Sequence, residues 1–150
     1  MIKRNEQGIL IVVSGPSGCG KSTVDNLLIK KRKNIIMSVS DTTRPPRNGE
    51  VNGKDYNFIT AKEFENNIKN DKYLEYAKVH DNKYYGTPSK FVNNKLIEGI
   101  DVILEIDIEG ARKIKEKRSD AVFIFIMPPS MEILKSRLVL RKTETKEQII

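Results

Sequence analysis

The sequence predicts a three-layer α/β fold, in which a parallel sheet lies between helices and carries a small α+β insertion. Three observations support this prediction: buried-strand patterns, helical patterns between several of them, and one long stretch of different character. The strand patterns are apolar runs rich in β-branched or aromatic residues, at Ile9–Val13, Ile35–Val39, Val102–Ile106 and Ala121–Met127. Each run is nearly continuous, as expected for strands covered on both faces. Strands that alternate with helices favour a parallel sheet with right-handed crossovers, and ligands bind at the carboxyl ends of such strands.

The first strand leads into a glycine-rich segment that fits the phosphate-binding pattern G-x-x-x-x-G-K-[ST]. This segment is Gly15-Pro16-Ser17-Gly18-Cys19-Gly20-Lys21-Ser22, and Thr23 after it opens a helix. A strand before and a helix after give the pattern the context that its mechanism needs. The glycines let backbone N–H groups curl around phosphate oxygens, and the helix N-terminus adds partial positive charge. Lys21 would contact the outer phosphates and the Ser22 hydroxyl would coordinate Mg²⁺. The segment Gly15–Thr23 therefore predicts a P-loop NTPase-type sheet that binds ATP.

The predicted helices carry apolar stripes at helical spacing. The stripes are Val24, Leu27 and Leu28 after the phosphate loop, Ala111 and Ile114 after the third strand, and Ile133, Leu134 and Leu138 near the end. Pro128-Pro129 ends the last strand, and Ser130 is placed to cap the last helix.

The stretch 41–94 has the signals of a mixed α+β unit. Asn52-Gly53 indicates a hairpin, and Thr60 with Glu63 is typical of a capping box. Tyr73–Val79 alternates as a strand does and is followed by a turn at Asp81-Asn82-Lys83. Thr87-Pro88 resembles an N-cap with proline at the first helical position, and Gly99 a helix stop. We therefore divide the chain into a core (1–40 and 95–150, with the start of a lid at about 131–150) and an insertion (41–94).

Composition narrows the class of protein. The chain of 150 residues fits one domain with a real core, and no apolar run approaches the length of a membrane span. Cys19 is the only cysteine, which excludes an internal disulfide and suits a reducing cytoplasm. The net charge of +7 comes from lysines spread along the chain, which favours a solvated basic surface over nucleic-acid binding.

Further polar residues are placed for chemistry. Arg44 and Arg47, stiffened by two prolines, suit a phosphate, and Tyr56 and Tyr85 supply further hydroxyl donors. Glu105 and Asp107 share one side of the third strand, so both can face the cleft, with Asp107 as an acid beside Mg²⁺. Arg137 and Arg141 lie four residues apart, on one helix face.

In this order and at this spacing, the chain resembles guanylate kinase. The segments that carry the resemblance are Ser14–Thr23, Ser38–Ser40, Thr42–Arg47, Gly49–Phe58, Glu75–Ala77, Tyr85–Pro88, Leu104–Ala111 and Pro128–Ser130. The phosphate loop alone predicts only an NTPase. The combination of the phosphate loop, the arginine segment and the acidic strand end is specific for the guanylate kinase pattern.

The resemblance implies Mg²⁺-dependent transfer of the ATP γ-phosphoryl group to GMP, giving GDP and ADP. It implies that the GMP phosphate is held by Arg44, Arg47, Tyr56 and Tyr85. It implies that the rest of the GMP site comprises Ser40, Glu75, Thr87, Glu105 and Asp107. Guanine offers paired N–H donors that a carboxylate accepts in a fork, which agrees with these acids. The implied catalytic residues are Lys21, Arg44, Arg137 and Arg141, and the implied metal ligands are Ser22 and Asp107. Because phosphoryl transfer depends on positioning and charge neutralisation, we expect no covalent intermediate and no histidine base, and we place His80 in a strand of the insertion.

The chain also departs from the family pattern. Asp41 adds negative charge near the expected phosphate clamp, Glu109 replaces a glutamine, and Leu140 and Lys142 replace lid glycines. The family continues past the position of Ile150 with another lid arginine, a helix, a strand and a closing helix, so either the chain is truncated or its ATP site is incomplete. Three functions stay open: an active guanylate kinase, a non-catalytic guanylate-kinase-like module that binds phosphorylated peptides, and a nucleotide-binding fragment. The intact phosphate loop favours the enzyme.

Overall fold

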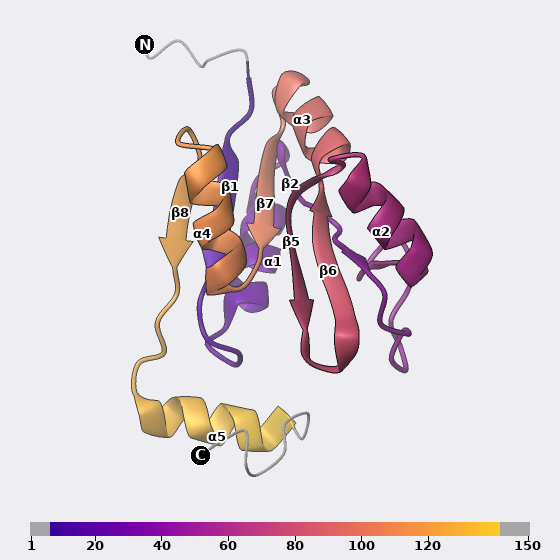
Figure 1. Cartoon of the computed structure of the whole chain (residues 1–150). Helices are drawn as coiled ribbons and strands as arrows, with labels where there is room; N and C mark the ends of the chain where they lie inside the picture. The colour runs from indigo at the N-terminus through magenta and orange to yellow at the C-terminus, as the bar shows by residue number, and fades with distance from the viewer. Residues whose placement is uncertain (1–6, 142–150) are drawn as a thin grey trace, which may run out of the picture.

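A four-stranded parallel sheet forms the centre of the molecule. The computed structural model describes residues 7–141, except for the side chains of His80 and Arg141. The strand order is β2 (Ile35–Met37), β7 (Asp101–Glu105), β1 (Leu10–Ser14) and β8 (Val122–Phe125). Each neighbouring pair is parallel, so all four carboxyl ends lie at one edge (Figure 1). No helix within residues 7–141 has the length and apolar character of a membrane span.

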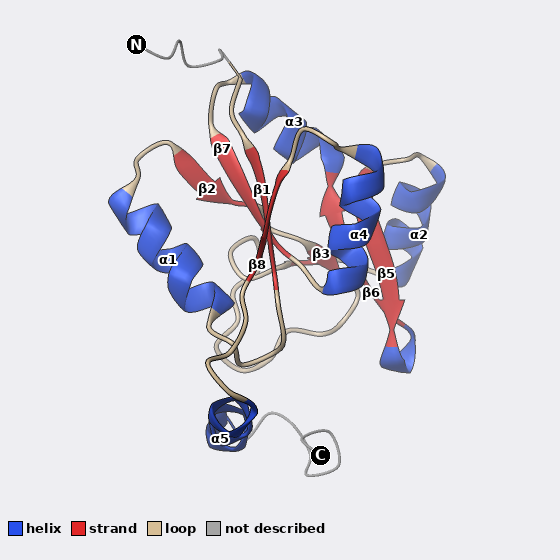
Figure 2. Ribbon diagram, turned by 90° about the vertical axis from the view of Figure 1, so that its left-hand side faces the viewer, coloured by secondary structure: helices blue, strands red, loops and turns tan. Residues whose placement is uncertain are grey.

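Helices cover both faces of this sheet, which makes the three layers that the sequence predicts. Figure 2 shows α1 (Lys21–Lys31) on one face, with α3 (Ser89–Ile97) and α4 (Ile108–Lys117) on the other. Strand alternation divides the core accordingly. Leu10 and Val12 of β1 pack in the cluster that includes the α4 residue Ile114. Val13 points the opposite way and packs in a cluster with the α1 residues Leu28 and Ile29.

A second sheet, set beside the first, forms most of the predicted insertion. Its strand order is β4 (Asn57–Phe58), β3 (Asp41–Thr42), β6 (Lys83–Pro88) and β5 (Tyr73–Val79). Only β3 and β4 pair in parallel. The helix α2 (Ala61–Lys69) begins with the predicted capping box between Thr60 and Glu63. It buries Phe64 between the rings of Tyr73 and Tyr84, at centroid distances of 4.5 and 5.0 Å.

Other local predictions have mixed outcomes. The turn between β5 and β6 is confirmed as the 3₁₀ helix η1 (His80–Asn82), which includes His80 rather than leaving it in a strand. Gly99, at φ 77°, follows the last turn of α3 as predicted. The Thr87-Pro88 cap is wrong: both residues belong to β6, and Pro88 is the N-cap. Asn52-Gly53 forms a tight loop closed by an isolated bridge to Tyr56, not a two-stranded hairpin.

Two predictions of burial are also wrong. Val24 and Leu27 of α1 are about half exposed, whereas Leu28, the third residue of the predicted stripe, does turn inward, together with Asp25 and Ile29. All four residues of β8 are exposed, since β8 pairs only with β1 and no helix within residues 7–141 covers it as α1 and α4 cover β1. After β8 the chain leaves the sheet for α5 (Met131–Arg141), capped as predicted by Ser130, whose Oγ accepts from the Ile133 N–H at 3.2 Å.

Candidate functional site

The loops that leave the carboxyl ends of β1, β7 and β2 converge at one edge of the parallel sheet. The loop after β1 is the glycine-rich segment, and its shape depends on residues without a β-carbon. A Cβ on Gly15, at φ 149°, would lie 2.3 Å from the carbonyl oxygen of Ile126. A Cβ on Gly18, at φ 81°, would lie 3.0 Å from Leu138 of α5. The loop is therefore held between the end of β8 and the last helix.

This loop lines a pocket of about 290 Å³. Lys21 lies half-buried at the start of α1, and its Nζ donates to the carbonyl oxygens of Gly15 and Pro16 at 2.8 and 3.0 Å. The ammonium group thus lies across the mouth of the loop. Glu105, Ile106 and Asp107, which follow one another at the end of β7, form the opposite wall. Backbone N–H groups, a helix N-terminus and an ammonium group make a site for phosphate groups.

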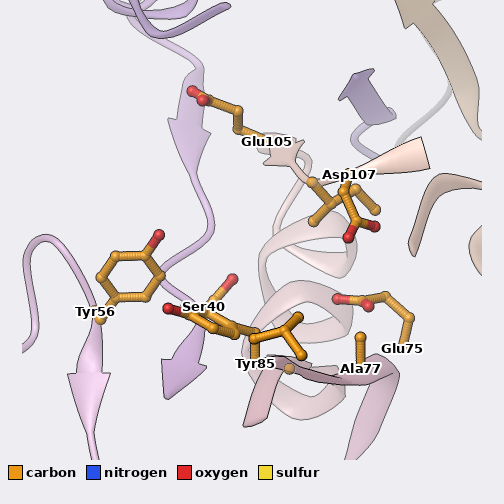
Figure 3. A pocket seen from close by; sticks show the side chains of 10 residues that line it. Ser40, Tyr56, Glu75, Ala77, Tyr85, Glu105 and Asp107 are labelled. Carbon is orange, nitrogen blue, oxygen red and sulfur yellow. The ribbon is translucent and has the colours of Figure 1, made fainter. Parts of the chain in front are cut away.

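A second pocket of about 240 Å³ lies on the other side of that wall, between β7 and the second sheet. Figure 3 shows the hydroxyl-bearing residues Ser40, Tyr56 and Tyr85 on one side and the carboxylates of Glu75 and Asp107 on the other. Ala77, Val79 and Gly86 add apolar surface. The pocket combines apolar surface with acceptors and hydroxyls, which suits a ligand that carries N–H donors.

Glu75 is the most buried acid of this second pocket. It comes from β5 and is 6% exposed, and its Oε1 accepts a 2.7 Å hydrogen bond from the hydroxyl of Thr87 on β6. Burial raises the pKa of Glu75, and the charge of Asp107 raises it further, while the hydrogen bond from Thr87 lowers it. A Cβ on Gly110 would lie 3.1 Å from Glu75 Oε2, so the first turn of α4 fits closely against the carboxylate.

Arg44 is held rigidly at the side of this pocket. Its Nη1 and Nη2 donate to the two carboxylate oxygens of Glu50 at 2.7 and 2.9 Å, and its Nε donates to the Tyr85 hydroxyl at 3.0 Å. The guanidinium carbon also lies 5.2 Å from the centre of the Tyr56 ring. The hydrogen bond to Arg44 lowers the pKa of Glu50 to about 2, and the same pair raises the pKa of Arg44. The side chain of Arg47 is exposed, and its backbone N–H donates to Glu50 at 2.7 Å.

The wall between the two pockets carries two acids with different partners. Glu105 Oε1 accepts a 3.0 Å hydrogen bond from the Ser22 hydroxyl. Asp107 caps α4, accepting from the Gly110 N–H at 2.7 Å. Among residues 7–141 no group of three His, Cys, Asp or Glu side chains is arranged to bind a metal ion. The oxygens of Ser22, Glu105 and Asp107 nevertheless line one phosphate pocket, and such hard oxygen ligands fit Mg²⁺ that arrives with a nucleotide.

Arg137, one of the two predicted lid arginines, lies apart from this wall. Arg137 of α5 donates to the carbonyl oxygen of Cys19 at 3.4 Å, behind the phosphate loop. It lines a separate pocket of about 480 Å³ with residues of the loop, among them Gly20 and Thr23. The helix α5 ends at Arg141, whose side chain lies outside the described part of the structure, as does Lys142. Glu109 is exposed and pairs with Arg112 at 2.8 Å.

Three residues near the site have a placement that the sequence did not indicate. Glu50 pairs with Arg44, and Gly110 makes room for Glu75. Asp25 of α1 is 1% exposed, and burial raises its pKa to about 7, with Glu105 raising it further and Lys21 lowering it. In the sequence, the only signal for the burial of Asp25 was its place on the same helix face as Leu28. Asp41, expected near the arginine clamp, instead turns inward to Tyr73 and Asn57, at 2.8 and 2.9 Å.

The fold and the two adjoining pockets define a P-loop nucleotide-binding protein. The family model described as guanylate kinase matches residues 7–150. The guanylate kinase of Caldanaerobacter subterraneus subsp. tengcongensis is 57% identical over 145 residues, which are 97% of this chain and 70% of that protein. The guanylate kinase of Clostridium perfringens is 54% identical over 149 residues, which are 99% of this chain and 68% of that protein.

A solved structure agrees with these relatives. The crystal structure of guanylate kinase from Anaplasma phagocytophilum matches with a TM-score of 0.73 at 42% identity, covering 87% of this chain and 66% of that one. The chain therefore belongs to the guanylate kinase family, which consists of P-loop nucleoside monophosphate kinases. It spans about two thirds of the length of these relatives.

Proposed function

We propose that this protein is a guanylate kinase that transfers the γ-phosphoryl group of ATP to GMP, giving GDP and ADP. The observation that carries the proposal is the common wall of the two pockets, Glu105 to Asp107. Phosphates on the loop side and a base on the Glu75 side would meet at this wall. Two ligands held that close react as if at high local concentration, which is the main contribution that a kinase site makes.

The acceptor side has the chemistry to select guanine. Glu75 would accept the N1–H and N2–H donors of guanine, while Ser40 and Thr87 would complete the polar edge. Adenine has no such pair of donors and would leave a buried carboxylate with only its bond from Thr87, which is a strong basis for rejection. The hydroxyls of Tyr56 and Tyr85 would join Arg44 and Arg47 on the GMP phosphate. Support comes from the position of Arg44, already oriented by Glu50 and Tyr85.

The donor side would bind the triphosphate along the loop Gly15–Thr23. Lys21 would exchange its bonds to Gly15 and Pro16 for the outer phosphates. Ser22 and Asp107 would hold Mg²⁺, which when bound supplies neutralisation of charge on the β- and γ-phosphates. In the transfer, a GMP phosphate oxygen forms a bond to the γ-phosphorus while the bond from that phosphorus to the bridging oxygen of ADP breaks. Arg137 and Arg141 would approach from α5 to balance the charge that moves.

The test is the formation of GDP by the full chain, measured by a coupled assay for ADP and by chromatography of the nucleotides. Turnover that requires ATP, GMP and Mg²⁺ together, with little activity on AMP, is the expected result. Tight binding of ATP without turnover would favour a nucleotide-binding fragment. Binding of a phosphorylated peptide without ATP would favour the non-catalytic module. Either result would overturn the proposed reaction.

A further inference from the structure

Two lysines of α4 bind the backbone of the strand that carries Glu75. The Nζ of Lys113 donates to the carbonyl oxygen of Tyr76 at 2.5 Å. The Nζ of Lys117 donates to the carbonyl oxygen of Leu74 at 3.1 Å. These two carbonyl groups belong to the residues directly after and directly before Glu75. A helix of the core thus contacts a strand of the insertion on either side of the acid in the acceptor pocket, and Figure 2 shows α4 lying beside β5.

The spacing of the lysines matches the spacing of the carbonyl groups. Lys113 and Lys117 lie four positions apart, so they share one face of α4 and are separated along it by about 6 Å. Carbonyl groups two positions apart in a strand point to the same side and are separated by about 6.8 Å. Among the strands of residues 7–141, β5 pairs with β6 alone, so its other edge has no strand beside it. The two ammonium groups supply donors to that edge in place of a strand.

A β-bulge lies at the same point of β5. Two steps along β5, from Tyr73 to Glu75, match a single step along β6, so Leu74 is an extra residue. Leu74 and Glu75 are neighbours in a strand, yet both are buried: Leu74 packs in the main core cluster, whereas Glu75 lines the acceptor pocket. Because a bulge disrupts the ladder locally, the direction of Glu75 depends on contacts from outside the sheet. The bond from α4 to the Leu74 carbonyl is one of these contacts.

The carboxylate of Glu75 lies between the same helix and β6. Thr87 of β6 donates to Oε1 at 2.7 Å. The other oxygen, Oε2, lies against the first turn of α4, where a Cβ on Gly110 would be 3.1 Å away. A shift of β5 along α4 would therefore move this carboxylate relative to the rest of the pocket.

We propose that Lys113 and Lys117 are positioning residues for the recognition of guanine. They hold β5 in register with α4, so that the Glu75 carboxylate stands where it can accept both N–H donors of the base. Both lysines are exposed and neither lines the acceptor pocket, so they act through the backbone of the Glu75 segment and not by contact with the ligand. The inference rests on the proposed function, because it assigns the lysines a part in binding GMP.

The experiment compares pairs of substitutions in the full chain. Lys113→Met with Lys117→Met removes both donors and keeps the apolar stems of the side chains. Lys113→Arg with Lys117→Arg keeps a donor and a positive charge at each position. The control pair, Lys62→Met with Lys115→Met, removes two exposed lysines and the same net charge, and the second of these lies on a different face of α4.

Titration calorimetry measures the binding of GMP, of IMP and, separately, of ATP with Mg²⁺. IMP keeps the N1–H of guanine but lacks the amino group at C2, so it offers the carboxylate one donor instead of two. The preference for GMP over IMP therefore reports how well the carboxylate is aligned. A loss of packing alone would not change this preference.

We expect the methionine pair to weaken GMP binding by about tenfold, because two hydrogen bonds that align the acceptor are lost. IMP should lose less affinity, so the preference for GMP over IMP should fall, and ATP binding should be unchanged. The arginine pair should keep most of the affinity for GMP. The control pair should bind all three nucleotides as the native chain does.

Several outcomes would overturn the inference. Unchanged GMP binding by the methionine pair would remove the positioning role. An equal loss of GMP, IMP and ATP with a lower unfolding temperature would show damaged packing, and an equal loss in the control pair would show an effect of net charge. If the methionine pair does not fold, Lys113→Met alone takes its place in the same comparison. A native chain that binds no GMP would remove the proposed function and the inference together, whereas native binding with unaffected variants removes the inference alone.

Discussion

The hydroxyl of Thr87 lies 2.7 Å from Oε1 of Glu75, and both side chains are buried between β5, β6 and the first turn of α4. Thr87 occupies one acceptor oxygen and leaves the carboxylate aimed into the acceptor pocket. The bond thus fixes the direction of the group that would distinguish guanine from adenine. The bond also brings together, in the acceptor pocket, two residues that are twelve positions apart in the chain.

Glu75→Gln should weaken GMP binding on the order of 10²-fold while leaving ATP binding unchanged. The amide keeps the shape and the bond to Thr87 but presents an N–H₂ group to a ligand that offers donors. Titration calorimetry measures both ligands. Glu65→Gln, an exposed acid on α2, is the matched control. Equal loss of both ligands would show damaged folding instead of lost recognition.

The affinity for GMP should depend on pH through Glu75. Burial raises the pKa of this carboxyl group above its usual value. The ionised form accepts the guanine donors, so affinity is full above the raised pKa and falls as the pH drops through it. The fall should begin at a higher pH than an ordinary glutamate would give. Comparison with Glu75→Gln separates this titration from that of the GMP phosphate. Parallel profiles in the two proteins would contradict the assignment.

Lys21→Met should reduce GDP formation by about 10²-fold or more, since one preorganised charge at the transferring group is lost. The fold should remain, because the hydrogen bonds of this side chain within the described residues go to the carbonyl oxygens of the loop itself, those of Gly15 and Pro16. Steady-state kinetics and far-ultraviolet circular dichroism test the two parts. A normal rate of GDP formation would refute the role of the phosphate loop.

Arg44→Lys should weaken GMP binding by about tenfold, the equivalent of one charged hydrogen bond. Lysine cannot form the two-pronged bond to Glu50 and the further bond to Tyr85 that orient the guanidinium group. Guanosine, which lacks the phosphate, should bind both proteins alike. Arg112→Lys, which changes a surface pair with Glu109, serves as the control. An equal loss of guanosine binding would mean that Arg44 shapes the pocket and not the phosphate clamp.

Tyr73→Phe should destabilise the protein by about 1–2 kcal/mol, the cost of removing a donor from a buried acid. The Tyr73 hydroxyl bonds to Asp41 Oδ2 at 2.8 Å, which leaves Asn57 as the other side-chain donor to that carboxylate. Urea denaturation measures the change in the free energy of unfolding. Tyr76→Phe on the same strand, where the side chain is 39% exposed, should change it little. Similar losses in both variants would contradict the structural role of the Asp41 bond.

Local sequence signals predicted the features that depend on neighbouring residues alone. The capping box at Thr60, the cap at Ser130 and the glycine after α3 depend on residues within one turn of each other, and the structure confirms all three. The two central strands were also predictable, because the continuous apolar runs of β1 and β7 reflect burial on two faces. The assignments of individual site residues stay predictions until ligands are measured.

The remaining features depend on contacts between distant segments. The apolar residues Val24 and Leu27 of α1 are about half exposed, so they did not reveal that Asp25 is the residue this helix buries. Likewise, a pair such as Arg44 with Glu50 cannot be distinguished in a sequence from two solvated charges. The exposure of β8 depends on its place at the edge of the sheet, which no run of apolar residues encodes.

The wall formed by Glu105, Ile106 and Asp107 also constrains how this protein can diverge. A substitution at any of these positions alters the donor and acceptor pockets at once, so neither affinity can be adjusted there independently. Independent changes of acceptor preference are therefore expected on the acceptor side alone, at Ser40, Tyr56, β5 and β6, and independent changes of donor preference in the glycine-rich loop. Selection for a new acceptor would leave the end of β7 almost untouched.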